Sequence, residues 1–363
     1  MKFKRYTLSE LATIKYGKNQ KKVATEDKNI PIYGTGGLMG YATTYLYDKP
    51  SVLIGRKGSI GKVKYVEHPF WTVDTLFYTV IDTDIVIPKY LYYIMSLIDL
   101  NNYNEGTTIP SLRTETLNRL ELDIPSIENQ KLVLSHLNPI DEKIELNNAI
   151  NNNLFQQAQS LYKDRFIDMT PFDGTMPEDW HSGTVSEIIE LHDSKRIPLS
   201  NRERANLAKV YPYYGATSVM DYVDRYLFDG IYLLLGEDGT VVDGKGLPIL
   251  QYVEGKFWVN NHAHIITGKN GFSVELLYLL FSLTSVQSIV TGAVQPKISQ
   301  ANLNKVPVII PSDGELKAFD TTMQPLFAHI RNLRAENDRL AYTRDTLLPK
   351  LMSGELDVSK INL

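Results

Sequence analysis

The 363-residue chain contains a long internal repeat, which restricts the folds that it can adopt. The stretch IPIYGTGGLMGYATTYLYDKPSVLIGRKGSIG returns 181 residues later as YPYYGATSVMDYVDRYLFDGIYLLLGEDGTVV, and FWTVDTLFYTV returns 187 residues later as FWVNNHAHIIT. This spacing is much longer than the repeat unit of a solenoid, which runs to about 50 residues. The sequence therefore predicts a domain that is present in two copies.

A glycine-rich run in the first copy, LIGRKGSIGKV, has the composition of a phosphate-binding loop. A P-loop needs four residues between its glycines and a hydroxyl after the lysine, but five residues separate Gly55 from Gly61 and Val63 replaces the hydroxyl. The second copy, LGEDGTVV, carries acids where the first has Arg56 and Lys57. We interpret the shared glycines as a turn between strands, and the different tips as two related readers with different targets.

Each copy is followed by a segment rich in helix formers, with apolar residues at alternating steps of four and three. This period predicts two long helices that pair as an antiparallel coiled coil. The expected helix-pairing positions are Ile140, Ile144, Asn151, Leu154 and Leu161 in the first helix and Met323, Leu326, Ile330, Leu333, Asn337, Leu340 and Leu347 in the second. The two asparagines among them would fix the register of the pair.

Pro139 and Pro325 are expected to end a short leading helix and to let the long helix begin. At about 1.5 Å per residue, the first long helix would measure about 40 Å, close to one turn of B-DNA. Two readers held about that far apart could contact the same face of one duplex.

These patterns predict an α+β fold: duplicated mixed α/β domains separated by long helices that form an antiparallel coiled coil. The two domains are expected at residues 1–125 and 171–311, the two spacer helices at 126–170 and 312–353, and a C-terminal tail at 354–363.

Charge is unevenly distributed, although the formal net charge of the chain is −4. Residues 1–64 hold 13 Lys and Arg against 4 Asp and Glu, whereas residues 65–130 hold 3 against 10. Residues 193–209 form a weaker basic segment, with 5 basic and 2 acidic side chains. Basic surfaces of this kind favour a polyanionic partner such as double-stranded DNA.

The sequence contains no cysteine, which is typical of a reducing compartment and excludes thiolate sites. It has no apolar run of about 18 residues that could cross a membrane, and its polar start MKFKRYTLSE does not look like a signal peptide. We therefore expect a cytoplasmic protein without a membrane partner.

The order of these segments resembles the specificity subunit of type I restriction-modification systems over essentially the whole chain. The resemblance rests on IPIYGTGG with LIGRKGSIG, on YPYYGATS with YLFDGIYLLLGEDG and FWVNNHAHII, and on the helix ends QSLYKDRF and LLPKLMSGEL. It implies a non-catalytic subunit in which each target-recognition domain reads one half of a split DNA sequence. It also implies that the helices set the gap and bind two methyltransferase subunits, and that nuclease-translocase subunits complete the enzyme.

No cofactor is expected in this chain, because the resemblance assigns S-adenosylmethionine, ATP and Mg to the partner subunits. The sequence agrees, since it has no P-loop and no Asn or Asp followed by two prolines and an aromatic residue, the motif expected of an amino-methyltransferase. His262 and His264 lie two residues apart, but the sequence places no third metal ligand near them, so we interpret them as structural.

Charge and loop placement identify candidate DNA contacts, because phosphate contacts need positive charge. They are Lys18, Lys21, Lys22, Arg56, Lys57 and Arg113 in the first domain and Lys195, Arg196, Arg202, Arg204 and Lys297 in the second.

Two other hypotheses stay open at the level of sequence. One is a metal-dependent nuclease that uses carboxylates such as Asp74 and Glu105, although Asn261 stands at the position of Asp74 in the second copy. The other is a solitary sequence-specific DNA-binding protein that forms homodimers through its helices.

Overall fold

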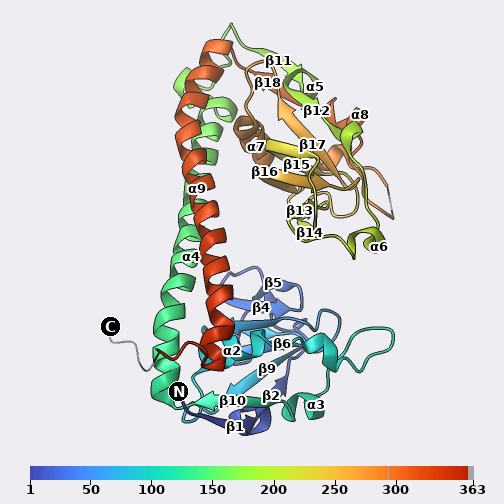
Figure 1. Cartoon of the computed structure of the whole chain (residues 1–363). Helices are drawn as coiled ribbons and strands as arrows, with labels where there is room; N and C mark the ends of the chain where they lie inside the picture. Colours follow the sequence, from blue (N-terminus) through green and yellow to red (C-terminus); the bar gives the residue numbers. More distant parts are fainter. Residues whose placement is uncertain (293, 359–363) are drawn as a thin grey trace. The chain divides into compact units, whose positions relative to one another are not determined.

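The computed structural model of the chain describes residues 1–292 and 294–358. The chain folds into two compact units: unit 1 combines Met1–Glu145 with the C-terminal segment that starts at Asn337, and unit 2 is Leu146–Glu336. The long helices α4 (Ile127–Tyr162) and α9 (Asp313–Ser353) each contribute to both units. The predicted α+β fold with a duplicated domain and long helices is confirmed (Figure 1). Residues 359–363 of the expected tail lie outside the described residues.

Unit 1 is built on strand pairs that are antiparallel, apart from one parallel pair in its third sheet. The strand β1 (Phe3–Thr7) pairs with β10 (Glu121–Pro125). A second sheet has the order β2-β9-β6-β7, with strands Ala12–Tyr16, Leu76–Ile81, Ser51–Gly55 and Val63–Val66. A third has the order β3-β5-β4-β8, with strands Ala24–Thr25, Gly37–Ala42, Ile30–Gly34 and Trp71–Thr72. The helices are α1 (Leu8–Leu11), α3 (Thr114–Asn118) and α2 (Pro88–Ser96), which packs on β6 and β7.

Unit 2 repeats this arrangement. The strand β11 (His181–Thr184) pairs with β18 (Pro307–Ile310). A larger sheet has the order β12-β17-β15-β16-β13-β14, with strands Ile189–Leu191, Ala263–Gly268, Phe228–Gly236, Leu250–Val259, Tyr211–Tyr214 and Val219–Val223. The helix α7 (Val274–Leu283) packs on β15, β16 and β17. Shorter helices are α5 (Val185–Ile188), α6 (Asn201–Arg204) and α8 (Gln300–Leu303).

Strand register confirms that the two units are copies. In the β6–β9 pair Gly55 lies opposite Leu76, and in β15–β17 Gly236 lies opposite Ala263. One difference is that β7 and β8 are separate strands, whereas β16 continues through both positions. Pro69 lies in the break of unit 1 and has no backbone N–H to donate to a ladder, which accounts for the interruption.

The glycine-rich run of the sequence forms a turn, as predicted, and not a P-loop. Gly58 has φ +85° and its counterpart Gly239 has φ +84°, a left-handed conformation that favours glycine. A Cβ on Gly55 would lie 2.2 Å from the carbonyl oxygen of Ser59, so the chain passes too closely for a side chain there.

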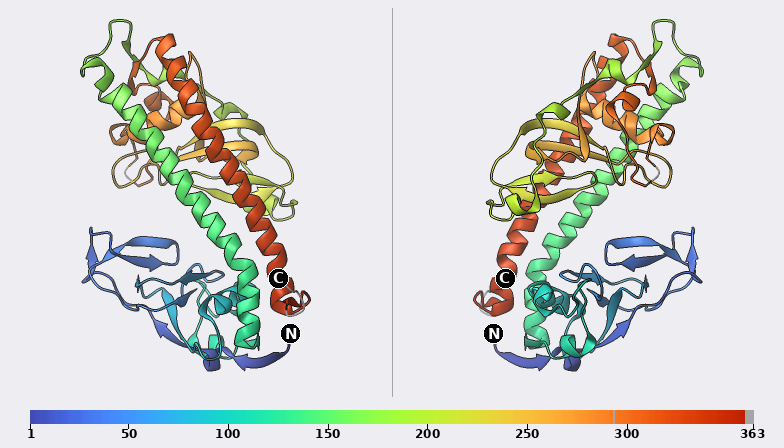
Figure 2. Two further views of the ribbon diagram at one scale, coloured as in Figure 1. Left: turned by 90° about the vertical axis from the view of Figure 1, so that its left-hand side faces the viewer. Right: turned by 90° about the vertical axis from the view of Figure 1, so that its right-hand side faces the viewer.

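The two helices contact each other antiparallel within each unit. In unit 1, Arg344 donates to Asp141 at 3.0 Å. In unit 2, Arg165 bonds to Glu315, and Asn147 donates to Glu336 at 2.8 Å. Within unit 2, α4 (green) and α9 (red) lie side by side in both views of Figure 2.

Most of the expected helix-pairing positions are at least partly buried. Met323, Ile330 and Leu333 are buried, and Ile140, Ile144, Asn151, Leu154, Leu326, Asn337, Leu340 and Leu347 are half-buried. Leu161 is 46% exposed and lines a shallow cleft of about 240 Å³ beside Phe319 and Met323. Asn147 of α4 is fully buried, although the sequence did not single it out as a register device.

The prediction that Pro139 and Pro325 end a helix is wrong, because α4 and α9 continue through them. An interior proline costs a helix about 3 kcal/mol. The neighbouring turns bury apolar groups, since Leu137, Met323 and Phe327 are inaccessible to solvent. Burial of each such side chain contributes about 1.5–3 kcal/mol, so packing outweighs the missing hydrogen bond.

Replacing Pro139 with Ala would restore the missing N–H, and we expect the free energy of unfolding of unit 1 to rise by about 1–3 kcal/mol. Pro139 is exposed, so the new side chain meets no steric conflict. Scanning calorimetry measures the effect as a rise of several degrees in Tm, and Pro325→Ala provides the matched change in unit 2. An unchanged or lower Tm in both variants would contradict this account.

Candidate nucleic-acid interface

Several loops of unit 1 are tied to one short segment, residues 71–75. The Lys18 N–H donates to Thr72 O at 2.8 Å, and the Trp71 indole donates back to Lys18 O at 2.8 Å. The Val73 N–H donates to Tyr33 O at 3.0 Å and so holds the β4–β5 hairpin. These bonds use mainly backbone groups, so the loop side chains remain available for other contacts.

The turn at residues 55–60 joins the same segment and carries a further loop. The Arg56 N–H donates to Thr75 O at 2.9 Å. The loop 104–113 attaches to the turn, because the Gly58 N–H donates to Pro110 O at 2.9 Å and the Leu112 N–H to Arg56 O at 3.0 Å. We call these five segments, residues 17–22, 34–37, 55–60, 71–75 and 104–113, the loop cluster of unit 1.

The loop cluster of unit 1 gathers the basic residues that the sequence selected. Lys18, Lys21, Lys22, Lys57 and Arg113 are exposed on it, and Arg56 is half-buried. The Arg56 guanidinium lies over the Tyr16 ring, 5.1 Å from its centroid, and donates to Asp74 O at 2.8 Å. Arg113 forms an ion pair with Glu105 at 3.1 Å. These six basic residues therefore place positive charge on one group of loops.

Unit 2 builds an equivalent cluster with the same backbone bonds. The Trp258 indole donates to Ile197 O at 2.6 Å, and the Asn260 N–H donates to Tyr214 O at 3.0 Å. The Glu237 N–H donates to His262 O at 2.8 Å, in the place of the Arg56 bond of unit 1. We call residues 192–200, 215–218, 236–241, 258–262 and 294–300 the loop cluster of unit 2.

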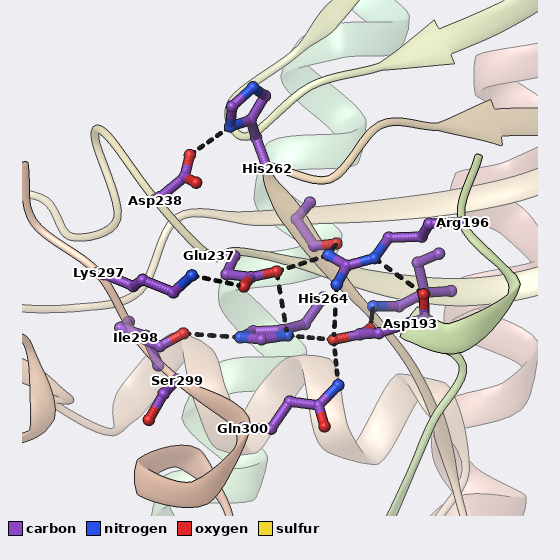
Figure 3. A network of polar contacts seen from close by, with 12 residues as sticks. Asp193, Arg196, Glu237, Asp238, His262, His264, Lys297, Ile298, Ser299 and Gln300 are labelled. Carbon is purple, nitrogen blue, oxygen red and sulfur yellow. Dashed lines mark hydrogen bonds and ion pairs between the residues drawn. The ribbon is translucent and has the colours of Figure 1, made fainter. Parts of the chain in front are cut away.

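A charged network joins residues of the loop cluster of unit 2 to His264 (Figure 3). His264 faces Asp193 through Nδ1 at 2.5 Å and the Ile298 carbonyl through Nε2 at 2.8 Å. Asp193 also accepts from Gln300 at 2.6 Å and from the Ile265 N–H at 2.9 Å. Both ring nitrogens of His264 therefore have hydrogen-bond partners, and the buried ring is held from two sides.

The acidic members of this network are each bonded to a cation. Arg196 donates to Glu237 at 2.6 Å, and the Lys297 ammonium lies 3.1 Å from the other Glu237 oxygen. Burial acts to raise the pKa values of Asp193 and Glu237, but hydrogen bonds from His264 and Arg196 outweigh it and hold both pKa values below their ordinary range. The two carboxyl groups therefore stay ionised within the fold.

Asp193, Glu237 and His264 place their ligand atoms within 4.8 Å of one another, as a metal site would. No third ligand lies near the histidines in the sequence, and the structure brings two carboxylates to His264 from distant loops. Their oxygens are already bonded to Arg196, Lys297 and other donors. A metal ion would have to displace these cations, so we interpret the cluster as an ion-pair network.

The same three positions hold different chemistry in unit 1. By the repeat, Tyr16, Phe77 and Arg56 stand where unit 2 has Asp193, His264 and Glu237. Tyr16 and Phe77 meet edge to face, with centroids 5.0 Å apart, and Arg56 lies over Tyr16. The two copies therefore support the tip of the turn in different ways, by aromatic packing in unit 1 and by ion pairs in unit 2.

The basic candidates of unit 2 fall into two groups. Lys195 and Arg202 are exposed, and Lys297 is exposed beside Glu237. Arg196 is largely buried in the network, and Arg204 is buried against the Tyr213 ring at 4.7 Å. These two guanidinium groups hold the fold together.

Arg204 and Lys209 both bind Asp221, at 3.0 Å and 2.8 Å. Hydrogen bonds from Lys209, from the Tyr222 N–H and from Arg204 lower the pKa of Asp221 to about 2. Sequence charge alone could not separate such structural arginines from surface ones.

Each unit also carries an exposed methionine next to its loop cluster, at the same place in the repeat. Met39 is 59% exposed and Met220 is 54% exposed. A Cβ on Gly34 would lie 2.2 Å from Met39 Sδ, and one on Gly215 would lie 2.4 Å from Met220 Sδ, so each methionine sits over a glycine of its own hairpin. The two methionines correspond in the sequence repeat, but the sequence analysis did not identify them as candidate site residues.

Asp74 and Glu105, the carboxylates of the nuclease hypothesis, do not form a metal-type cluster among the described residues. Glu105 binds Arg113 and the Thr116 hydroxyl, and Asp74 interacts with Arg56 through its backbone oxygen. Among the residues that the structure describes, the metal-type cluster found does not include them.

A family model described as the type I restriction modification DNA specificity domain matches residues 1–156 and 177–341. The chain belongs to this family. It is 26% identical over 347 residues to the type I restriction enzyme MjaIX specificity subunit of Methanocaldococcus jannaschii, covering 87% of this chain and 80% of that protein. It is 23% identical over 361 residues to the HindI specificity subunit of Haemophilus influenzae, covering 76% of this chain and 79% of that protein.

The fold is also similar to a solved structure. The crystal structure of the S subunit of a type I restriction-modification system from M. genitalium matches with a TM-score of 0.54 at 18% identity, covering 97% of this chain and 96% of that one. Family membership assigns the chain to DNA target recognition, together with other subunits of a restriction-modification system, and not to catalysis. None of the helices in the described residues is long and apolar enough to span a membrane.

The different burial of Arg204 and Arg202 leads to a stability test. We expect Arg204→Ala to lower the free energy of unfolding by about 1–3 kcal/mol, because it removes bonds to Asp221 and the Leu199 carbonyl. Arg202→Ala is the matched control and should leave stability unchanged, since Arg202 is exposed. Denaturant unfolding compares the two, and equal stability of both variants would contradict a structural role for Arg204.

Proposed function

We propose that the chain reads a bipartite DNA target, one half-site with each loop cluster. The observation that carries this proposal is one backbone frame present twice with opposite charge at its tip: Arg56 and Lys57 in unit 1, Glu237 and Asp238 in unit 2. A shared frame with different tips suits two different base sequences. The recognition domains are residues 1–125 and 171–311, and the spacer helices at 126–170 and 312–353 set the gap.

Nine of the basic candidates, eight of them exposed and Arg56 half-buried, are proposed as DNA contacts. They are Lys18, Lys21, Lys22, Arg56, Lys57, Arg113, Lys195, Arg202 and Lys297. Arg196 and Arg204 are left out, because their guanidinium groups are engaged inside the fold.

The proposal includes the partners that act on the target. Two methyltransferase subunits bind the helices, and nuclease-translocase subunits join them. S-adenosylmethionine, ATP and Mg are assigned to those subunits as part of the proposal. The complex works on genomic DNA in the cytoplasm.

The lysines of the first loop provide a test of DNA contact. Replacing Lys18, Lys21 and Lys22 with Ala should weaken DNA binding and reduce the slope of log K against log salt by up to about 2.7, because each phosphate contact contributes about 0.9. Binding titrations over a range of salt concentrations measure the slope. The control is Lys131→Ala, an exposed position on α4 outside the cluster, which should leave the slope unchanged. An unchanged slope in the triple variant would show that these lysines do not face the DNA.

Methylome sequencing of cells that express the chain with its partner subunits tests the function as a whole. We expect a motif of two half-sites around an unspecified gap, and no methyl transfer by the chain alone. Inserting seven residues into α4 after Asn148 preserves the apolar face of the helix and adds about 10 Å, or about three base pairs at 3.4 Å each. The gap should lengthen by up to that amount, with both half-sites unchanged.

A two-residue insertion at the same place is the control for this experiment. It rotates the following helix by about 200° and should destabilise the protein. An unchanged gap with full activity after the heptad insertion would show that the helices do not set the spacing, and altered half-sites would show that they take part in base readout.

A further inference from the structure

His262 differs from the other histidine of the VNNHAHII stretch in its surroundings. It lies in the turn between β16 and β17, inside the loop cluster of unit 2, and its side chain is 42% exposed. His264, two residues later, is inaccessible to solvent. The interpretation of both as structural residues therefore fits His264 and leaves His262 without a role.

The backbone of His262 is held on both sides. Its N–H donates to the Asn260 side-chain oxygen at 2.8 Å, and its carbonyl accepts from the Glu237 N–H at 2.8 Å. Asn260 is itself buried, and its amide nitrogen lies 3.1 Å from Met220 Sδ. An exposed side chain on a turn is usually free to move. Here the backbone that carries the side chain is fixed by these two hydrogen bonds.

The His262 ring is oriented by a carboxylate. Its Nδ1 bonds to Asp238, whose side chain is only 17% exposed, and the close-up shows this pair apart from the buried network (Figure 3). A carboxylate accepts, so the Nδ1 N–H donates to Asp238, and Nε2 is the ring nitrogen that this bond leaves open. Among the described residues no partner of Nε2 is found.

The position of Asp238 is fixed by contacts of its backbone and of its neighbour. It belongs to the tip of the turn, and its neighbour Glu237 is bound to Arg196 and Lys297. Asp238 also forms a backbone bridge with Lys297. The ion-pair network thus fixes the residue that orients the His262 ring, which is the kind of support that a specificity contact needs.

We propose that His262 reads a base in the half-site of unit 2, with Nε2 forming a hydrogen bond to a base edge in the major groove. The proposal rests on the proposed function of the loop cluster. A phosphate contact is distinguished by experiment, because its loss would weaken binding to all sequences equally. In this domain the reading group is then an oriented imidazole on an acidic tip, whereas the tip of unit 1 carries Arg56 and Lys57.

The test compares His262→Ala with wild type in the complex with its methyltransferase partner. Competition binding uses duplexes that carry each of the four bases at each position of the methylated motif. At one position of one half-site we expect discrimination to fall by about tenfold, consistent with one lost base contact, and the other half-site to be read as before. Asp238→Ala should weaken discrimination at the same position, because it releases the ring.

Thr75→Ala provides the matched control, since Thr75 occupies the place of His262 in the first copy. It should leave the half-site of unit 2 unchanged. Thermal unfolding of each variant accompanies the binding data, and a large loss of stability in His262→Ala would overturn the proposal in favour of a structural role. An unchanged motif would overturn the proposal by showing that His262 faces solvent. Equal weakening of binding to all sequences would overturn it by showing that His262 contacts a phosphate.

Failure of the proposed function has a different signature. In that case the wild-type complex itself yields no bipartite motif, whereas failure of the inference leaves the wild-type motif intact and His262→Ala identical to it.

Discussion

Each recognition domain depends on a tryptophan whose indole N–H is bonded inside the fold to the backbone of the first loop. Trp71 donates to Lys18 O at 2.8 Å, and Trp258 donates to Ile197 O at 2.6 Å. A buried donor left without a partner would cost about 1–3 kcal/mol, so this bond determines where the loop passes. Because the acceptors are backbone carbonyls, the frame makes few demands on the loop side chains. These side chains can change with the DNA target while the fold stays the same.

The tips of the two turns show that loop side chains can differ between the copies, and that such differences depend on the neighbouring loops. Arg56 rests on the face of Tyr16 in unit 1. Glu237 takes the same place in unit 2, where an unpaired and largely buried carboxylate would be costly. Arg196 and Lys297 neutralise it, and they come from other loops of the cluster. A change of charge at the tip therefore needs a matching change in the neighbouring loops, so the loops of one copy form a set that cannot be exchanged one at a time.

The sequence predicted the features that arise from repeated or periodic patterns. The duplication, the turn at Gly58 and the two helices follow from spacing alone, and the structure confirms them. The continuation of α4 through Pro139 could not be predicted, because it depends on burial by parts of the chain that are distant in sequence. The same holds for Arg204, whose basic character gives no sign that it is buried. The contact of Asp193 with His264 joins residues that are 71 apart in sequence, and no local motif marks it.

The helices make the first domain dependent on the end of the chain. Leu348, Leu351 and Met352 of α9 are buried in the core of unit 1, together with Leu137 of α4. The N-terminal ammonium group also binds Asp357 at 2.8 Å. Unit 1 therefore closes only after the whole second copy has been made, and the added loop costs little, since closure entropy grows only with the logarithm of loop length. A chain with the first copy alone would expose these apolar surfaces of its helix and core. Folding thus favours the presence of both copies in one molecule.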